Sequence, residues 1–128
     1  NWFWGRALVV DGTVYAGSLD GKVYALDART GAKRAGFGVD GTFATKGAVR
    51  APIAYADGTL YVASEDMQVY ALDAATGAQR WAYNAGGPVL AAPVVQGSSV
   101  YGSTSTGKAF ALDAQTGSQR WVFPQPTK

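Results

Sequence analysis

Three aspartates stand at the same place in an internal repeat and are the first residues whose chemistry matters. Asp27, Asp73 and Asp113 each lie three residues before the threonine of a Thr-Gly pair. Recurrent carboxylates could bind a metal ion or transfer a proton. An aspartate in this position can instead accept backbone N–H bonds and so fix a turn. Because all three copies occupy one place in the repeat, we expect the structural role.

A glycine-rich segment at residues 102–108 reads Gly-Ser-Thr-Ser-Thr-Gly-Lys, which fits the pattern of a phosphate-binding loop. In such a loop a serine or threonine follows and holds magnesium, but here the next residue is Ala109. A phosphate loop also joins a strand to a helix, and we expect no helix here. We therefore predict that residues 102–108 form a turn between two strands.

The composition excludes several classes of function. The 128-residue chain has no histidine and no cysteine, so it cannot itself form a Cys/His zinc site, a disulfide or a Ser-His-Asp triad. A net charge of +2 without a run of like charge argues against nucleic acid as a partner. No apolar run reaches the ~20 residues that span a bilayer, so we do not expect the chain to span a membrane.

One sequence pattern recurs three times. Tyr-Ala-Leu-Asp-Ala at residues 24–28 returns at 70–74 and, with Phe for Tyr, at 110–114. Runs rich in Val, Tyr and Thr, separated by Asp-Gly and Thr-Gly turns, divide each repeat into four short strands. The strands are expected at residues 3–10, 13–18, 23–28 and 33–37, then 49–56, 59–64, 69–74 and 79–83, then 90–95, 99–103, 109–114 and 119–123. Because every connection is short, neighbouring strands should pair antiparallel.

Four-stranded units repeated every 40 to 45 residues or so are typical of β-propeller blades. We therefore predict an all-β protein with three blades, at residues 1–46, 47–86 and 87–128, in one continuous arc. Each blade must stack on the next to bury both of its faces. A closed propeller has about 4–8 blades, so three make a partial, open propeller. The chain would then be a fragment of a longer protein, pair with a second copy, or lean on another subunit.

The repeated segment resembles the tryptophan-docking motif of pyrroloquinoline-quinone-type (PQQ-like, BamB-like) β-propellers. The matching residues are Ala71, Asp73, Thr76, Gly77 and Trp81, then Ala111, Asp113, Thr116, Gly117 and Trp121, with Asp27, Thr30 and Gly31 in the first repeat. The resemblance implies that Trp81 and Trp121 pack between blades rather than stack on a ligand.

The first repeat departs from this motif. Ala35 stands where a tryptophan is expected, so the first blade either lacks the inter-blade contact or meets a different partner there. We align Phe37 with Tyr83 and Phe123, and we place the extra residues of the first repeat around positions 38–46.

An aromatic cluster at the start of the chain is the candidate interface. Trp2, Phe3 and Trp4 align with Ala48, Val49 and Arg50 near the start of an innermost strand. Two readings remain open: the cluster caps the edge of the first blade, or it contacts a missing blade or a partner.

Three functions are compatible with these residues. The first is a non-catalytic protein-interaction scaffold, a subunit of a larger assembly. The resemblance implies an extracytoplasmic location for it, periplasmic or at the outer face of a membrane. The second is a fragment of a PQQ-dependent dehydrogenase. The resemblance implies that such an enzyme uses a calcium or lanthanide ion held by Glu and Asn, a catalytic Asp and often a vicinal disulfide. This chain has a single glutamate, two asparagines and no cysteine. The third is a propeller that binds a small ligand or carbohydrate. We expect the scaffold, with no cofactor and no metal in this chain.

Overall fold

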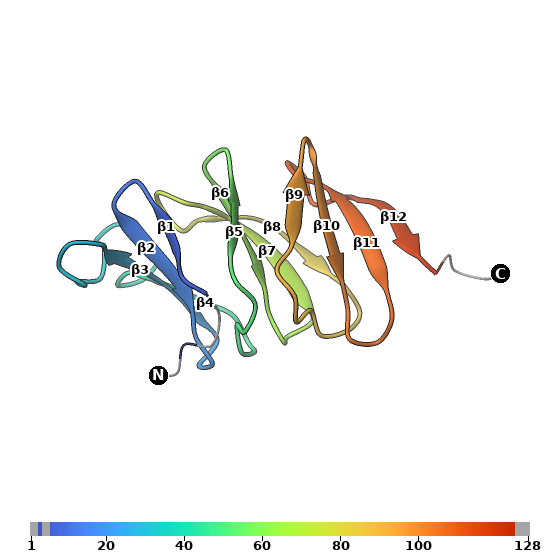
Figure 1. Cartoon of the computed structure of the whole chain (residues 1–128), viewed down its shortest axis with the longest axis horizontal. Coiled ribbons are helices and arrows are strands. Elements are labelled where there is room, and N and C mark those ends of the chain that lie inside the picture. Colours follow the sequence, from blue (N-terminus) through green and yellow to red (C-terminus); the bar gives the residue numbers. More distant parts are fainter. Residues whose placement is uncertain (1–2, 4–5, 125–128) are drawn as a thin grey trace.

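The chain is built entirely of short strands, and no described residue is in a helix (Figure 1). The computed structural model describes residue 3 and residues 6–124. The described part therefore contains no helix that could cross a membrane. The strands are β1 Leu8–Val10, β2 Thr13–Gly17, β3 Lys22–Asp27, β4 Thr42–Ala44, β5 Ala54–Ala56, β6 Thr59–Ala63, β7 Gln68–Asp73, β8 Gln79–Asn84, β9 Val94–Gln96, β10 Ser99–Ser103, β11 Ala109–Asp113 and β12 Gln119–Phe123.

The strands form three antiparallel sheets of four, in the orders β1-β2-β3-β4, β5-β6-β7-β8 and β9-β10-β11-β12. We call these sheets the first, second and third blades. Tight turns join neighbouring strands; Asp11-Gly12 and Asp57-Gly58 both have positive φ, which Asp-Gly hairpin turns require. The blades lie side by side along the long axis, with the two chain ends at opposite ends of the molecule (Figure 1). The predicted all-β arrangement of four-stranded antiparallel sheets is confirmed.

Two hydrophobic cores fill the spaces between the blades rather than the interior of any one blade. The first joins Tyr15 and Val23 of the first blade to Leu60, Val62 and other residues of the second. The second joins the opposite face of the second blade to the third. A blade has two faces, and each face needs a neighbour. A lone four-stranded sheet of this kind would leave apolar side chains in water.

The fourth strand of the first blade differs from the prediction. We expected residues 33–37, but β4 is Thr42–Ala44, and Lys33 makes only an isolated bridge to Leu26. The chain leaves the sheet after Arg34, forms a loop at residues 35–41 and returns to pair with β3. The alignment of Phe37 with Tyr83 was therefore wrong. Phe43 takes that place, since it pairs with Val23 as Tyr83 pairs with Val69.

The first strand of each blade is shorter than predicted. The apolar runs at residues 3–10, 49–56 and 90–95 supply strands of only three residues. Residues 49–53 and 90–93 instead belong to the connections between blades. Val49 packs in the first core, and its N–H donates to the Ser18 carbonyl oxygen. Phe3 makes an isolated bridge to Ser18.

The glycine-rich segment at residues 102–108 forms the predicted turn. Its first two residues end β10, residues 104–108 form the turn to β11, and the Thr104 N–H donates to the Lys108 carbonyl oxygen across the turn at 2.8 Å. A strand follows Lys108 rather than a helix, so the arrangement that presents a phosphate to a helix N-terminus does not occur here.

Candidate functional site

The three aspartates of the repeat act on the turn that follows each of them. Asp73 Oδ1 accepts bonds from the backbone N–H groups of Ala75 and Thr76, at 2.9 and 3.0 Å. Asp27 and Asp113 make the same two bonds to the residues two and three positions ahead. Each carboxylate therefore fixes its own Thr-Gly turn, which is the role expected for it.

Arginines hold the other carboxylate oxygen in the second and third blades. Arg80 Nη2 is 2.7 Å from Asp73 Oδ2, and Arg120 Nη2 is 2.9 Å from Asp113 Oδ2. The arginine hydrogen bond and the backbone N–H groups lower the pKa of both carboxyls, because all of them stabilise the charged form. The pKa of Asp27 is lowered mainly by backbone N–H bonds, with Arg34 contributing less.

Trp81 joins the second blade to the third. Its side chain is 7% exposed and its Nε1 donates to the Ala114 carbonyl oxygen at 2.9 Å. The indole lies directly over Gly117, where a Cβ atom would come within 2.6 Å of the ring. Glycine is needed in this Thr-Gly pair for two reasons, since its φ is also +75°.

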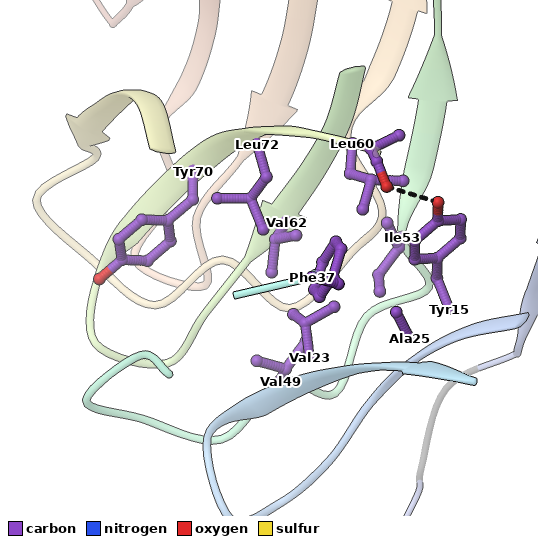
Figure 2. Packing of buried hydrophobic residues seen from close by; sticks show 11 residues of the cluster. Tyr15, Val23, Ala25, Phe37, Val49, Ile53, Leu60, Val62, Tyr70 and Leu72 are labelled. Carbon is purple, nitrogen blue, oxygen red and sulfur yellow. Dashed lines mark hydrogen bonds between the residues drawn. The ribbon is translucent and has the colours of Figure 1, made fainter. Parts of the chain in front are cut away.

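Phe37 makes the corresponding contact between the first and second blades, although sequence alignment missed it. Phe37 is 2% exposed, and a Cβ atom on Gly77 would lie 3.2 Å from its ring. It packs beside Tyr15 at a centroid distance of 5.8 Å, as Trp81 packs beside Tyr61 at 5.9 Å. Figure 2 shows its ring at the centre of the first core. The loop at residues 35–41 therefore brings a different aromatic residue to the position that Ala35 leaves empty.

Backbone acceptors at the two junctions receive different donors. The side chain of Phe37 has no N–H group to donate. At the first junction the Tyr15 hydroxyl donates to the Ala74 carbonyl oxygen at 2.6 Å, drawn as the dashed line in Figure 2. The Gly38 N–H adds a bond to the Thr76 carbonyl oxygen at 2.8 Å. At the second junction Trp81 Nε1 donates to the Ala114 carbonyl oxygen at 2.9 Å. The Tyr61 hydroxyl donates to the same oxygen over a longer distance, 3.4 Å.

Trp121 occupies the same strand position as Trp81, but the prediction that it packs between two blades is wrong for the described residues, where no blade covers it. It pairs with Ala111 as Trp81 pairs with Ala71, yet it is 44% exposed. Phe123 and Val94 of the same blade are exposed as well, at 65% and 58%. We call this surface of Val94, Tyr101, Trp121 and Phe123 the trailing face.

A second open surface lies on the first blade. Nothing lies within 4 Å of a Cβ built on Gly31, whereas Gly77 and Gly117 are covered by aromatic rings. Phe3 is 50% exposed although Val49, its counterpart in the second blade, is fully buried. We call the surface of Phe3, Val9 and Gly31 the leading face; Tyr24 of the same blade is buried, at 6% exposed. Of the predicted interface cluster, Trp2 and Trp4 lie outside the described residues, and Phe3 packs edge-on against Tyr24 at 5.3 Å.

The residues that a quinone cofactor and its metal ion would use do not fit such a site in the described chain. The single glutamate, Glu65, is bonded to Arg50. The amide oxygen of Asn84 accepts from the Gly86 N–H at 2.9 Å and so closes a turn. Among residues 3 and 6–124, no three Asp or Glu side chains gather in a way that could hold a metal ion.

Comparison with known families places these blades. A family profile described as the outer membrane protein assembly factor BamB matches residues 19–128. The chain belongs to this PQQ-like family. The family, and the resemblance drawn from the repeated Asp, Thr, Gly and Trp residues, are therefore confirmed. A comparison with curated protein sequences gives no match.

Solved structures similar to this chain include BamB and dehydrogenases. BamB from Moraxella catarrhalis is 26% identical with a TM-score of 0.75, over 94% of this chain and 36% of that one. A europium-containing methanol dehydrogenase is 26% identical with a TM-score of 0.76, over 95% and 25%. A quinohemoprotein alcohol dehydrogenase from Comamonas testosteroni is 27% identical with a TM-score of 0.77, over 94% and 21%.

These structures are β-propellers, so the three sheets are propeller blades, as predicted. The PQQ-like chain described here spans about a third of that BamB and about a quarter or less of the two dehydrogenases.

Proposed function

We propose that this chain is a non-catalytic PQQ-like propeller module that acts as a protein-interaction scaffold. The observation that carries the proposal is the exposed Trp121, a docking residue whose equivalents at both internal junctions are buried. A face that exposes Val94, Trp121 and Phe123 together is typical of a surface that another protein element covers.

The occupant that we propose for each open face is a further PQQ-like blade. The two internal junctions are the template, because Trp81 and Phe37 each cover the glycine of the next Thr-Gly turn. On the trailing face, Trp121 covers no glycine of a following Thr-Gly turn. On the leading face, no aromatic ring covers Gly31. The docking residues of both faces are therefore complementary to those of another blade. The related structures are longer than this chain, which covers 36% of BamB and 25% of the methanol dehydrogenase.

The family supports a proposal for where this scaffold acts. The matching profile is described as the outer membrane protein assembly factor BamB, which supports a place outside the cytoplasm. We infer that this module belongs to a membrane-associated, extracytoplasmic assembly whose other members are proteins.

Self-association provides the test, because a second copy brings a PQQ-like blade to each face. We expect light scattering to give a mass above that of the monomer as concentration rises, and Trp121→Glu to restore the monomer. Met67→Glu is the matched control, since Met67 is 43% exposed on the turn between β6 and β7 and lies on neither face. Identical monomeric masses for the wild type and Trp121→Glu at every concentration would refute the role of the trailing face.

A fragment of a PQQ-dependent dehydrogenase is the second candidate, favoured by the similarity to two such enzymes. Reduction of a dye by the chain with alcohol, PQQ and calcium or a lanthanide ion distinguishes the two. The scaffold proposal predicts a rate equal to that of the cofactor alone. Turnover that requires the chain together with PQQ would contradict it.

A further inference from the structure

Two clefts lie between adjacent blades at corresponding places. The cleft between the first and second blades has a volume of about 380 Å³, and the one between the second and third blades about 470 Å³. Their linings are related by the repeat, residue by residue. Arg34, Asp11 and Tyr55 of the first cleft correspond to Arg80, Asp57 and Val95 of the second. The second cleft is therefore an internal reference against which the first can be compared.

Both terminal nitrogens of the arginine in the second cleft donate hydrogen bonds to the protein. Arg80 donates from Nη1 to the Thr59 hydroxyl and from Nη2 to Asp73 Oδ2. Arg120, its equivalent in the third blade, makes the same pair of bonds to Ser99 and Asp113 at 2.7 and 2.9 Å. Both guanidinium groups are thus fixed by a hydroxyl and a carboxylate of their own blade.

Arg34 is not held in this way. Its Nη1 is 3.7 Å from Asp27 Oδ2, and its guanidinium group donates no hydrogen bond to any described residue. Arg34 lacks these bonds because the chain turns out of the sheet directly after it. Arg80 and Arg120 lie within β8 and β12. A half-exposed guanidinium fork that keeps its donors is suited to bind a carboxylate with two parallel bonds.

The opposite wall of the first cleft also differs from the reference. Tyr55 of β5 is 37% exposed there, and Val95 stands at the corresponding place in the second cleft. The remaining charged groups that line the first cleft are Asp11, Asp73 and Arg80, and the last two are bonded to each other. Arg34 lies near Asp27 but keeps its hydrogen-bond donors for a ligand, and Asp11 opposes a ligand that carries more than one negative charge.

We propose that the cleft between the first and second blades binds a monocarboxylate that carries an aromatic or other apolar group. The carboxylate binds the guanidinium of Arg34 and the apolar group packs against the ring of Tyr55. The ligand is either a free organic acid or the terminal carboxylate of a polypeptide that ends in an apolar residue. This site does not depend on the proposed scaffold role, since it lies within the chain and away from both open faces.

Calorimetry or NMR titration of the whole chain tests the site with three probes: benzoate, a short peptide that ends in phenylalanine, and the same peptide with an amidated terminus. We expect benzoate or the free-acid peptide to bind and the amide not to bind. Arg34→Gln should weaken binding by about tenfold or more, as the loss of a charge-assisted bidentate contact implies. Tyr55→Val, which copies the second cleft, should weaken it severalfold.

Lys33→Gln is the control for net charge, because Lys33 is the neighbouring cation and pairs with Asp40 at 3.5 Å. Arg34→Lys keeps the positive charge but removes the guanidinium group that can form two parallel bonds to a carboxylate. This variant should bind the ligand more weakly than the wild type. Binding of benzoate alone would identify a free acid as the source of the carboxylate, and binding of the peptide would identify a polypeptide. The proposal is wrong if neither probe binds at millimolar concentration, or if Arg34→Gln binds as tightly as the wild type.

Discussion

The indole of Trp81 in the second blade lies over Gly117 in the third, so close that a Cβ atom on Gly117 would come within 2.6 Å of Trp81 Cδ2. The contact joins the last strand of one blade to the Thr-Gly turn of the next, and its repetition makes an arc of separate sheets into one folded unit. Phe37 and Gly77 form the equivalent pair at the first junction.

Substitution of Trp81 should therefore destabilise the protein strongly. We expect Trp81→Ala to lower the free energy of unfolding by about 3–5 kcal/mol, as for other large-to-small changes in a core. Trp121→Ala should cost much less, because this side chain is 44% exposed in the chain alone. Urea unfolding of the two variants under dilute conditions measures the difference. Equal losses would contradict the account of the junctions.

The glycines of the Thr-Gly turns offer a finer comparison. Gly31 and Gly117 share a φ of +75°, so alanine at either position carries the same backbone strain of about 1–2 kcal/mol. Only Gly117→Ala also collides with an indole. We expect Gly117→Ala to be clearly the less stable of the two in urea unfolding, and equal stability would show that the ring does not press on this position.

Phe37 should be as important to the first junction as Trp81 is to the second. Phe37→Ala is expected to cost about 3–5 kcal/mol of unfolding free energy. Val39→Ser, on the same loop, should be nearly neutral because Val39 is 81% exposed. A neutral Phe37→Ala in thermal or urea unfolding would mean that the loop at residues 35–41 does not hold the two blades together.

The inter-blade hydroxyl bonds should differ in their contribution to stability. Tyr15→Phe leaves the Ala74 carbonyl oxygen without its 2.6 Å donor and should cost about 1 kcal/mol or somewhat more. Tyr61→Phe should cost less, because Trp81 still donates to the Ala114 carbonyl oxygen. The difference between the two variants in urea unfolding checks this, and a larger loss for Tyr61→Phe would contradict it.

Acid should weaken the protein through Asp73 and Asp113. Their pKa values lie below the usual 3.8 because an arginine and backbone N–H groups stabilise the carboxylates. The stability that this contributes is present above the unfolded-state pKa and is lost as pH falls through the lower folded-state values. Urea midpoints measured from about pH 5 downward should fall less steeply in the Asp73→Asn, Asp113→Asn double variant than in the wild type. Identical slopes would show that these carboxylates do not contribute.

Sequence reasoning succeeded where the repeat itself determines the structure. Asp27, Asp73 and Asp113 occupy one position in one pattern, so the role of one could be inferred from the other two. Strand boundaries followed in the same way, except where a run such as residues 49–56 both forms a strand and connects two blades. The pattern says which residues face a neighbouring blade, but a connecting residue is held by contacts too far away in sequence to be seen.

Phe37 and Arg34 show the limit of that reasoning. The first repeat contains extra residues, and an alignment without spatial contacts cannot tell where they leave the strand. A placement at residues 38–46 kept Phe37 in the sheet, whereas the chain departs after Arg34 and carries Phe37 into the space between blades. The same departure separates Arg34 from the contacts that Arg80 and Arg120 keep, so the cleft residue was hidden for the same reason.

The most direct test of the scaffold account is whether the trailing face accepts the leading face of another copy. In a tandem fusion of two copies of the chain, the proposal places Trp121 of the N-terminal copy beside Gly31 of the C-terminal copy. In the fusion labelled with 5-fluorotryptophan, the two Trp121 fluorine signals are assigned by Trp121→Phe in each copy, and a soluble paramagnetic agent reports their exposure. We predict that Trp121 of the N-terminal copy is protected relative to Trp121 of the single chain at a concentration where the single chain is monomeric. Exposure of both Trp121 side chains equal to that in the monomeric single chain would contradict the proposal that this face binds a PQQ-like blade.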